Sequence, residues 1–126
     1  MEIAKKLFFL AMPLLVAGCS SITNLTPTQL PRNSSGLYPV EAEWKSRQQA
    51  IRNETIEPRV VIGLESYPMT PVPLVSNRWE TVIPVPANQK AVYYQFKFDY
   101  LYNAFPKPRK DSKLSREYKL EIVDPK

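Results

Sequence analysis

The side chains of this chain that are able to do chemistry are mainly carboxylates, cations and aromatic rings. The sequence has no histidine and a single cysteine, Cys19, although these two residue types supply the usual general bases, thiol nucleophiles and transition-metal ligands. Three glycines are also too few for a phosphate-binding loop. We therefore expect no enzyme and no bound metal. Glu41 and Glu43 are the carboxylate pair that a glycosidase would need, but alternate residues of one strand predict a solvated face instead.

A basic segment near the C-terminal end is the first feature that suggests binding. It holds five cations within ten residues, namely Lys107, Arg109, Lys110, Lys113 and Arg116. Asp111 is its one acidic residue. We expect a loop here, between the last two strands, that binds phosphate or carboxylate groups of a lipid or a partner protein. The alternative is a solubilising loop without a partner.

The aromatic side chains are the second feature, because they are more numerous than a small core requires. The candidates for exposed contacts are Tyr67, Tyr93, Tyr100 and Tyr102, with Trp44 and Trp79 as further members of the set. Exposed rings stack on sugars or anchor protein interfaces. The alternative is that these rings belong to the core.

The residues before Cys19 have the organisation of an export signal. Lys5 and Lys6 form a basic head, and Leu7–Ala17 supplies about ten apolar residues, whereas a membrane span takes about 20. Pro13 would break a buried apolar helix at this place. The run Leu15-Val16-Ala17-Gly18-Cys19 resembles the lipobox of bacterial lipoproteins.

This resemblance implies an anchored protein. Residues 1–18 would be removed as a signal peptide, and Cys19 would carry a diacylglyceryl group and an acylated amino group, which together anchor a chain stably in a membrane. The covalent lipid would be the only non-protein group. Ser20, where lipoproteins kept in the inner membrane of Gram-negative bacteria have Asp, favours the outer membrane. An exported chain with a net charge of +5 and dispersed cations is not expected to bind nucleic acid.

Alternation of apolar and polar side chains predicts strands along most of the chain after residue 37. The longest is expected over Ala91–Asn103, with Tyr94, Phe96 and Phe98 in the core and Gln95 and Lys97 solvated. Shorter strands are expected at 38–45, 60–64, 79–85 and 117–122. The segment 46–56 has no wide apolar stripe. We expect either a turn or two of helix or another short strand there.

These elements predict three parts: the signal peptide at 1–18, a lipidated flexible tether at 19–36, and one domain at 37–126. The tether is expected to be flexible because its polar residues and prolines bury too little to offset the cost of ordering. Several short antiparallel strands separated by turn signals predict an all-β fold, a two-layer antiparallel β-sandwich that resembles immunoglobulin-like domains in general. The Cys…Trp…Cys pattern of true immunoglobulin domains is absent.

Two functions are compatible with this reading. The first is a non-catalytic structural or protein-interaction subunit of a cell-envelope assembly, held to a membrane by its lipid and contacting an envelope protein. The second is a surface module that binds polysaccharide through exposed tyrosine and tryptophan. An exposed apolar strand edge would favour the first, and an exposed row of coplanar rings the second.

Overall fold

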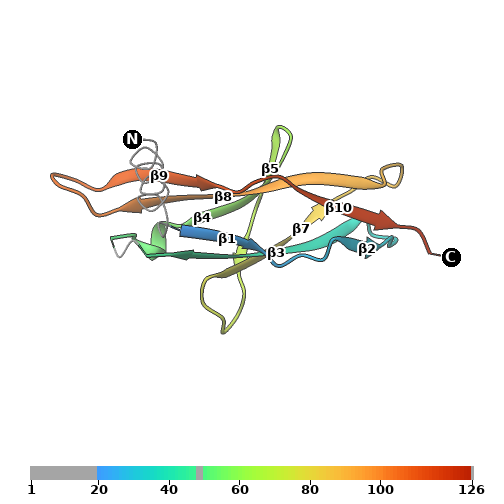
Figure 1. Ribbon diagram of the computed structural model, residues 1–126, viewed down its shortest axis with the longest axis horizontal. Helices are drawn as coiled ribbons and strands as arrows, with labels where there is room; N and C mark the ends of the chain where they lie inside the picture. Colours follow the sequence, from blue (N-terminus) through green and yellow to red (C-terminus); the bar gives the residue numbers. More distant parts are fainter. Residues whose placement is uncertain (1–19, 48–49, 126) are drawn as a thin grey trace, which may run out of the picture.

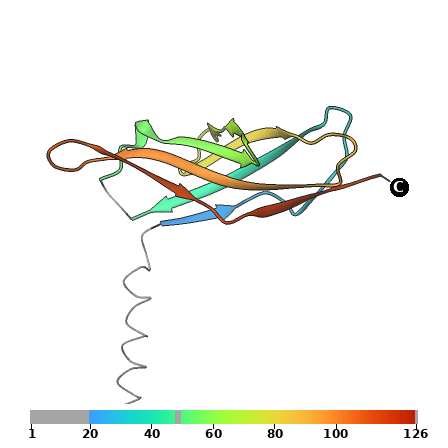
Figure 2. The ribbon, with the colours of Figure 1, turned by 90° about the horizontal axis from the view of Figure 1, so that it is seen from above.

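The computed structural model describes residues 20–47 and 50–125, which form two packed β-sheets (Figures 1 and 2). One sheet has four strands in the order β1 (Ser20–Asn24), β3 (Leu37–Ser46), β7 (Arg78–Pro84) and β6 (Thr70–Pro71). The other has the order β2 (Gln29–Pro31), β10 (Tyr118–Val123), β8 (Ala91–Tyr102), β4 (Glu57–Ile62) and β5 (Glu65–Pro68), and β9 (Arg109–Leu114) also pairs with β8. The predicted all-β sandwich is therefore confirmed, whereas the immunoglobulin-like topology stays a prediction.

The core lies between the sheets and is built mainly from the alternating residues of β3 and β8. Phe96 and Phe98 of β8 are completely buried, and Trp44 of β3 stacks on Phe98 with ring centroids 5.0 Å apart. The expected burial of Tyr94, Phe96 and Phe98 is thus confirmed. On the other face of β8, the side chain of Lys97 is 43% exposed, while Gln95 is partly buried because its amide donates to the Ser115 carbonyl oxygen at 2.9 Å.

Strand β8 is shared by three neighbours. Its first residues pair with β10, its last residues pair with β9, and β4 pairs with its middle along the opposite side. The change from β9 to β10 falls at Ser115, a buried residue. Its hydroxyl accepts the hydrogen bond of the Phe96 N–H, and its own N–H donates to the Phe96 carbonyl oxygen, both at 2.8 Å. Ser115 therefore satisfies the backbone of β8 where the two partner strands meet.

The expectation of a flexible tether over 19–36 is wrong for the residues described. Strand β1 pairs with β3 from its first residue, with Ser20 opposite Ser46, and β2 pairs with β10. Thr26, between them, is buried and exchanges hydrogen bonds with the backbone of Glu41. Residues 20–31 have few apolar side chains of their own, but they are ordered because β1 and β2 pair with β3 and β10, whose side chains form the core. The described part of the domain thus includes residues 20–36, which the expected boundary at 37 leaves out.

The pairing of β2 with β10 is parallel, so the second sheet is mixed rather than purely antiparallel as expected. The segment 46–56 contains an isolated bridge between Ile51 and Tyr102 and one turn of 3-10 helix at Asn53–Thr55, while residues 48–49 lie outside the description. The strand expected at 60–64 instead ends at Ile62, because Gly63 has a φ of 59° and begins a tight turn. The other predicted strands are confirmed to within a few residues.

Candidate functional site

The basic segment is a strand for most of its length, so the prediction of a loop is wrong. Residues Arg109–Leu114 form β9 and pair with the last part of β8, where Tyr102 lies opposite Arg109 and Phe98 opposite Lys113. Within the described chain, no strand pairs with the outer side of β9. Charged residues are typical of such an edge strand, since they prevent another chain from adding to it. The charges that suggested a loop are therefore those of a protected edge.

This geometry divides the five cations into separate groups. Directly opposed residues of an antiparallel pair point to the same side of the sheet, so Arg109 and Lys113 face the side of the core and Lys110 faces outward. Lys107 precedes the strand, in the turn between β8 and β9. Arg116 follows the strand, with its guanidinium 5.1 Å from the ring centroid of Tyr118. Lys107, Arg109 and Lys110 lie near the turn, whereas Lys113 and Arg116 lie near Ile22 of β1, with which they line a groove of about 370 Å³.

Tyr100, expected as an exposed contact, is instead part of the core. Its side chain is only 3% exposed and packs against Trp44, with ring centroids 5.2 Å apart. Only the hydroxyl reaches the edge, where it donates to Asp111 Oδ2 at 3.0 Å. Burial, with a further contribution from Asp111, raises the pKa of Tyr100 to about 12. The alternation of β8 explains this placement, because Tyr100 falls on the same face as Phe96 and Phe98.

We expect this tyrosine to make the protein sensitive to alkali. An unfolded tyrosine loses its proton near pH 10, whereas Tyr100 in the folded chain keeps its proton up to about pH 12. Its contribution to stability is present below pH 10 and is lost as the pH rises from about 10 to 12. In Tyr100→Phe, urea titrations across this window should give a shallower fall in the free energy of unfolding. The slope keeps a contribution from Tyr94, whose pKa is also raised by burial. Identical pH profiles for the two proteins would contradict the assignment.

The other aromatic candidates do not form a row on the described surface. Tyr67 and Tyr102 are partly buried and pack against the core, as does Trp79, and Trp44 is buried. Tyr93 is 52% exposed and lies on the outer face of β8, with the Lys119 ammonium 5.9 Å from its ring centroid. Among the tyrosines proposed as contacts, Tyr93 is the one with a largely exposed ring.

The two glutamates of β3 belong to a small network of ion pairs. Arg78 of β7 places Nη1 3.9 Å from Glu41 Oε2 and Nε 3.5 Å from Glu43 Oε2, and Lys45 lies 3.6 Å from Glu43 Oε1. Each of these side chains is at least one-fifth exposed. Their arrangement across neighbouring strands is that of a solvated face whose charges are paired, as the alternation of β3 predicts.

A broad hollow of about 810 Å³ lies beside β8 and β9, and its charged lining is mostly acidic: Glu54, Glu57, Asp99, Asp111 and Lys110. Among the described residues, no three histidine, cysteine or acidic side chains come together in a way that could hold a metal ion. The hollow is open to solvent and includes the Tyr100–Asp111 pair. Its acidic side chains lie beside the turn between β8 and β9 that carries Lys107.

Three exposed apolar side chains at loop tips were not among the contacts predicted from the sequence. Leu64 follows Gly63 in the turn between β4 and β5, Leu74 lies between β6 and β7, and Phe105 lies between β8 and β9; their exposed fractions are 104%, 107% and 93%. Leu74 also has a φ of 63°, which is unusual for a residue other than glycine. In the sequence, each is a large apolar residue next to glycine or proline. Leu64 ends the strand expected at 60–64, whereas Leu74 and Phe105 lie outside the expected strands.

Comparisons of this chain with protein-family models, with curated proteins and with solved structures found no match. None of the described segments forms a helix with the length and hydropathy of a membrane span. Cys19, the expected lipidation site, lies outside the described residues. The candidate contact surfaces of the described residues are the β8–β9 turn with Lys107, the groove beside Ile22 of β1, and the exposed loop tips.

Proposed function

We propose that this chain is a bacterial lipoprotein, anchored through Cys19, whose β-sandwich acts as a non-catalytic interaction or structural subunit of the cell envelope. The proposal rests first on the lipobox-like run that ends at Cys19. It rests also on the lack of histidine, and on a net positive charge that suits the anionic surface of a membrane.

The observation that carries the proposal furthest is the position of β1. The strand begins at Ser20, the residue that directly follows Cys19, and it is paired with β3 from that first residue. A lipid on Cys19 would then be separated from the folded domain by a single peptide unit, about 3.8 Å between Cα atoms. The sandwich would be held against the bilayer surface rather than at the end of a long tether.

All the edge strands of the two sheets except β1 favour contacts through loops rather than through added strands. Edge strands β2 and β6 both end in proline, β5 ends in Pro68, and β9 is mostly charged. Proline and charge on an edge oppose pairing with another chain. The exposed apolar residues lie instead at loop tips, which is where binding residues on β-sandwiches are often found. A partner protein in the envelope would therefore be contacted by loops.

Metabolic labelling with a fatty-acid analogue tests the anchor. The wild-type chain should incorporate the label, lose residues 1–18 and sediment with membranes. Cys19→Ser should give an unlabelled precursor, because a serine hydroxyl is a much poorer nucleophile than a thiolate. Absence of label from the wild type would overturn the proposal. In a Gram-negative host, separation of the two membranes would then show whether Ser20 directs the protein to the outer one.

A further inference from the structure

The turn between β8 and β9 combines an exposed aromatic ring with cations. Phe105 is 93% exposed at its tip, and Lys107, Arg109 and Lys110 follow it, all of them exposed. No acidic residue occurs from Asn103 to Lys110. An aromatic ring beside several cations is the composition by which proteins insert into the surface of an anionic membrane, because the ring enters the interface and the cations face lipid phosphates.

The base of this turn is fixed to the body of the domain. Tyr102 and Arg109 are the last pair of the β8–β9 ladder, and Tyr102 also forms a bridge with Ile51. Asn103 donates its N–H to the Ala50 carbonyl oxygen at 2.8 Å and accepts a hydrogen bond from Arg52 Nε at 2.7 Å. The turn therefore projects from an anchored base, and Phe105 is presented outward rather than folded back.

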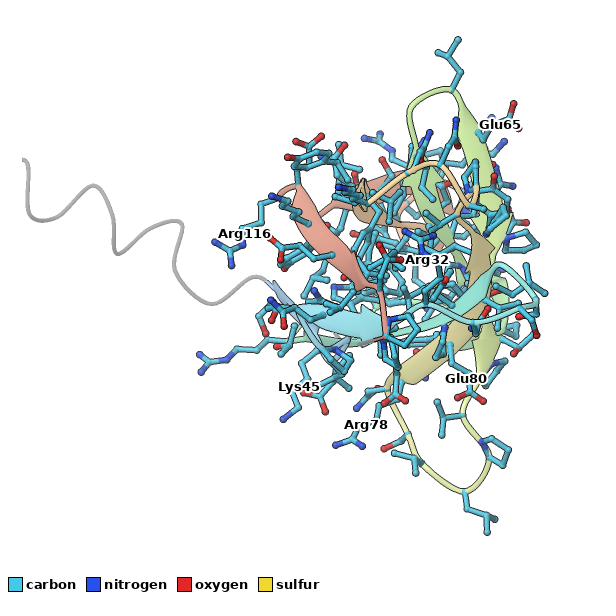
Figure 3. The ribbon with its side chains drawn as sticks, turned by 90° about the vertical axis from the view of Figure 1, so that its right-hand side faces the viewer. Arg32, Lys45, Glu65, Arg78, Glu80 and Arg116 are labelled. Atoms are coloured by element: carbon cyan, nitrogen blue, oxygen red, sulfur yellow. The ribbon has the colours of Figure 1, made fainter. Side chains whose placement is uncertain are left out.

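The turn also lies at the end of the domain from which the chain leads to Cys19. Ser20 is opposite Ser46 in β3, and the chain runs from Ser46 to Ala50 and Ile51, which contact the base of the turn. Figure 2 shows the start of β1 and the β8–β9 turn toward the same end of the molecule. On either side of the start of β1, Lys45 and Arg116 add further exposed cations (Figure 3).

The other two apolar tips provide a comparison within the same chain. Leu64 is followed by Glu65, and Leu74 has no cation within three residues. Arg78, the nearest cation that follows Leu74, is paired with Glu41 and Glu43. The loops of Leu64 and Leu74 project to opposite sides of the molecule in Figure 1, and Figure 3 places Glu65 on the side opposite Arg78 and Glu80. Of the three tips, that of Phe105 is the one that joins an exposed apolar side chain to cations at the anchored end.

We propose that the β8–β9 turn is a membrane-contacting element, in which Phe105 enters the interface of an anionic bilayer while Lys107, Arg109 and Lys110 face lipid phosphates. The proposal rests on the anchor of the proposed function, since that anchor holds this end of the domain at the bilayer. It adds a second, electrostatic attachment, which would fix the orientation of the sandwich relative to the membrane.

Site-specific photocrosslinking tests this contact. The full chain, carrying a benzophenone analogue of phenylalanine at position 105, would be purified from membranes and placed in vesicles of phosphatidylcholine with phosphatidylglycerol or of phosphatidylcholine alone. The same analogue at positions 64 and 74 provides matched controls, because those side chains are equally exposed. We expect lipid adducts from position 105 at a yield at least fivefold above either control, and mainly in the anionic vesicles.

Neutralising the cations should weaken the contact. Each cation near an anionic surface contributes about 1 kcal/mol to binding. Lys107→Gln and Lys110→Gln should therefore each reduce the yield of lipid adducts at position 105 by up to about fivefold. High salt should lower this yield too, because it screens the same charges. Equal lipid yields at the three positions would overturn the proposal. So would adducts from position 105 to a protein instead of lipid in intact cell membranes, since the turn would then be a protein-binding surface.

Fatty-acid labelling of the same preparations keeps this result separate from the anchor. A chain that carries label on Cys19 but shows no lipid adduct at position 105 contradicts the membrane contact alone. A chain without label contradicts the anchor, while the adduct yield per vesicle-bound chain still reports on the turn. Thermal unfolding of each variant shows that the substitutions at these exposed positions leave the fold intact.

Discussion

Phe96→Ala is expected to lower the free energy of unfolding by about 3 to 5 kcal/mol, the usual cost of removing a buried phenylalanine ring. Phe96 is 0% exposed, lies edge-on to Tyr94 with centroids 5.5 Å apart, and is 5.8 Å from the ring of Tyr118. The contact with Tyr118 joins β8 to β10, so the cavity left by alanine would lie where these two strands of the second sheet pair. A loss of this size is a large part of the 5 to 15 kcal/mol that stabilises a typical domain.

Lys97→Ala is the matched control for Phe96→Ala. It changes the adjacent residue of the same strand, whose side chain is 43% exposed and makes one long ion pair, 3.9 Å to Asp99. Such a surface substitution should change stability by no more than about 0.5 kcal/mol. Urea titration measures both values. Similar, small losses for the two variants would contradict the two-faced arrangement of β8.

Ser115→Ala is expected to cost about 1 to 3 kcal/mol, which is large for the loss of one oxygen atom. The Ser115 hydroxyl accepts from the buried Phe96 N–H at 2.8 Å and donates to the Arg116 carbonyl oxygen at 2.8 Å. Alanine would leave the Phe96 N–H without this partner inside the protein, and an unsatisfied buried donor carries its full desolvation cost. The effect should be local, at the point where β8 changes partner.

Hydrogen exchange at the Phe96 amide distinguishes this cause from a general loss of packing. Exchange there should accelerate more in Ser115→Ala than at other amides of β8. Ser112→Ala, an exposed position in the adjoining strand, should leave both exchange and stability nearly unchanged. Uniform acceleration along β8 would show that the hydroxyl acts through packing instead.

The strands that could be predicted are those whose own residues provide the buried face. In β3 and β8 every second side chain is apolar, so the period of two is visible within the segment itself. Strands β1, β2, β5, β6 and β9 were not predicted, because each is ordered by its pairing with a neighbouring strand. In β1, β2 and β9, for example, the sequences SSITN, QLP and RKDSKL each contain a single apolar residue other than proline. A strand that is stabilised by pairing with another segment does not need alternating apolar residues, so its own sequence does not identify it.

The candidate site was predictable in composition but not in shape. The sequence locates the basic residues 107–116, yet only the register that sets Phe98 opposite Lys113 shows that Lys113 and Lys110 point to different sides. The burial of Tyr100, by contrast, could have been predicted, because the alternation of β8 places it on the face of Phe96 and Phe98, whereas Tyr93 lies on the other face. Phe105 has no periodic context at all, so its exposure depends on a turn geometry that composition does not determine.

The parallel pairing of β2 with β10 has a consequence for the order in which the protein folds. Gln29 and Leu30 lie opposite Glu121 and Ile122, so two segments that are 92 residues apart along the chain must meet. If the chain is exported from its N-terminal end, as proposed, it cannot complete this sheet until residue 123 has crossed the membrane. Contacts so distant in sequence form slowly, because a long loop must close first. For a chain that is exported and anchored as proposed above, we therefore expect the domain to remain unfolded during translocation and to fold only after release, when the residue next to Cys19 would already lie at the lipid surface.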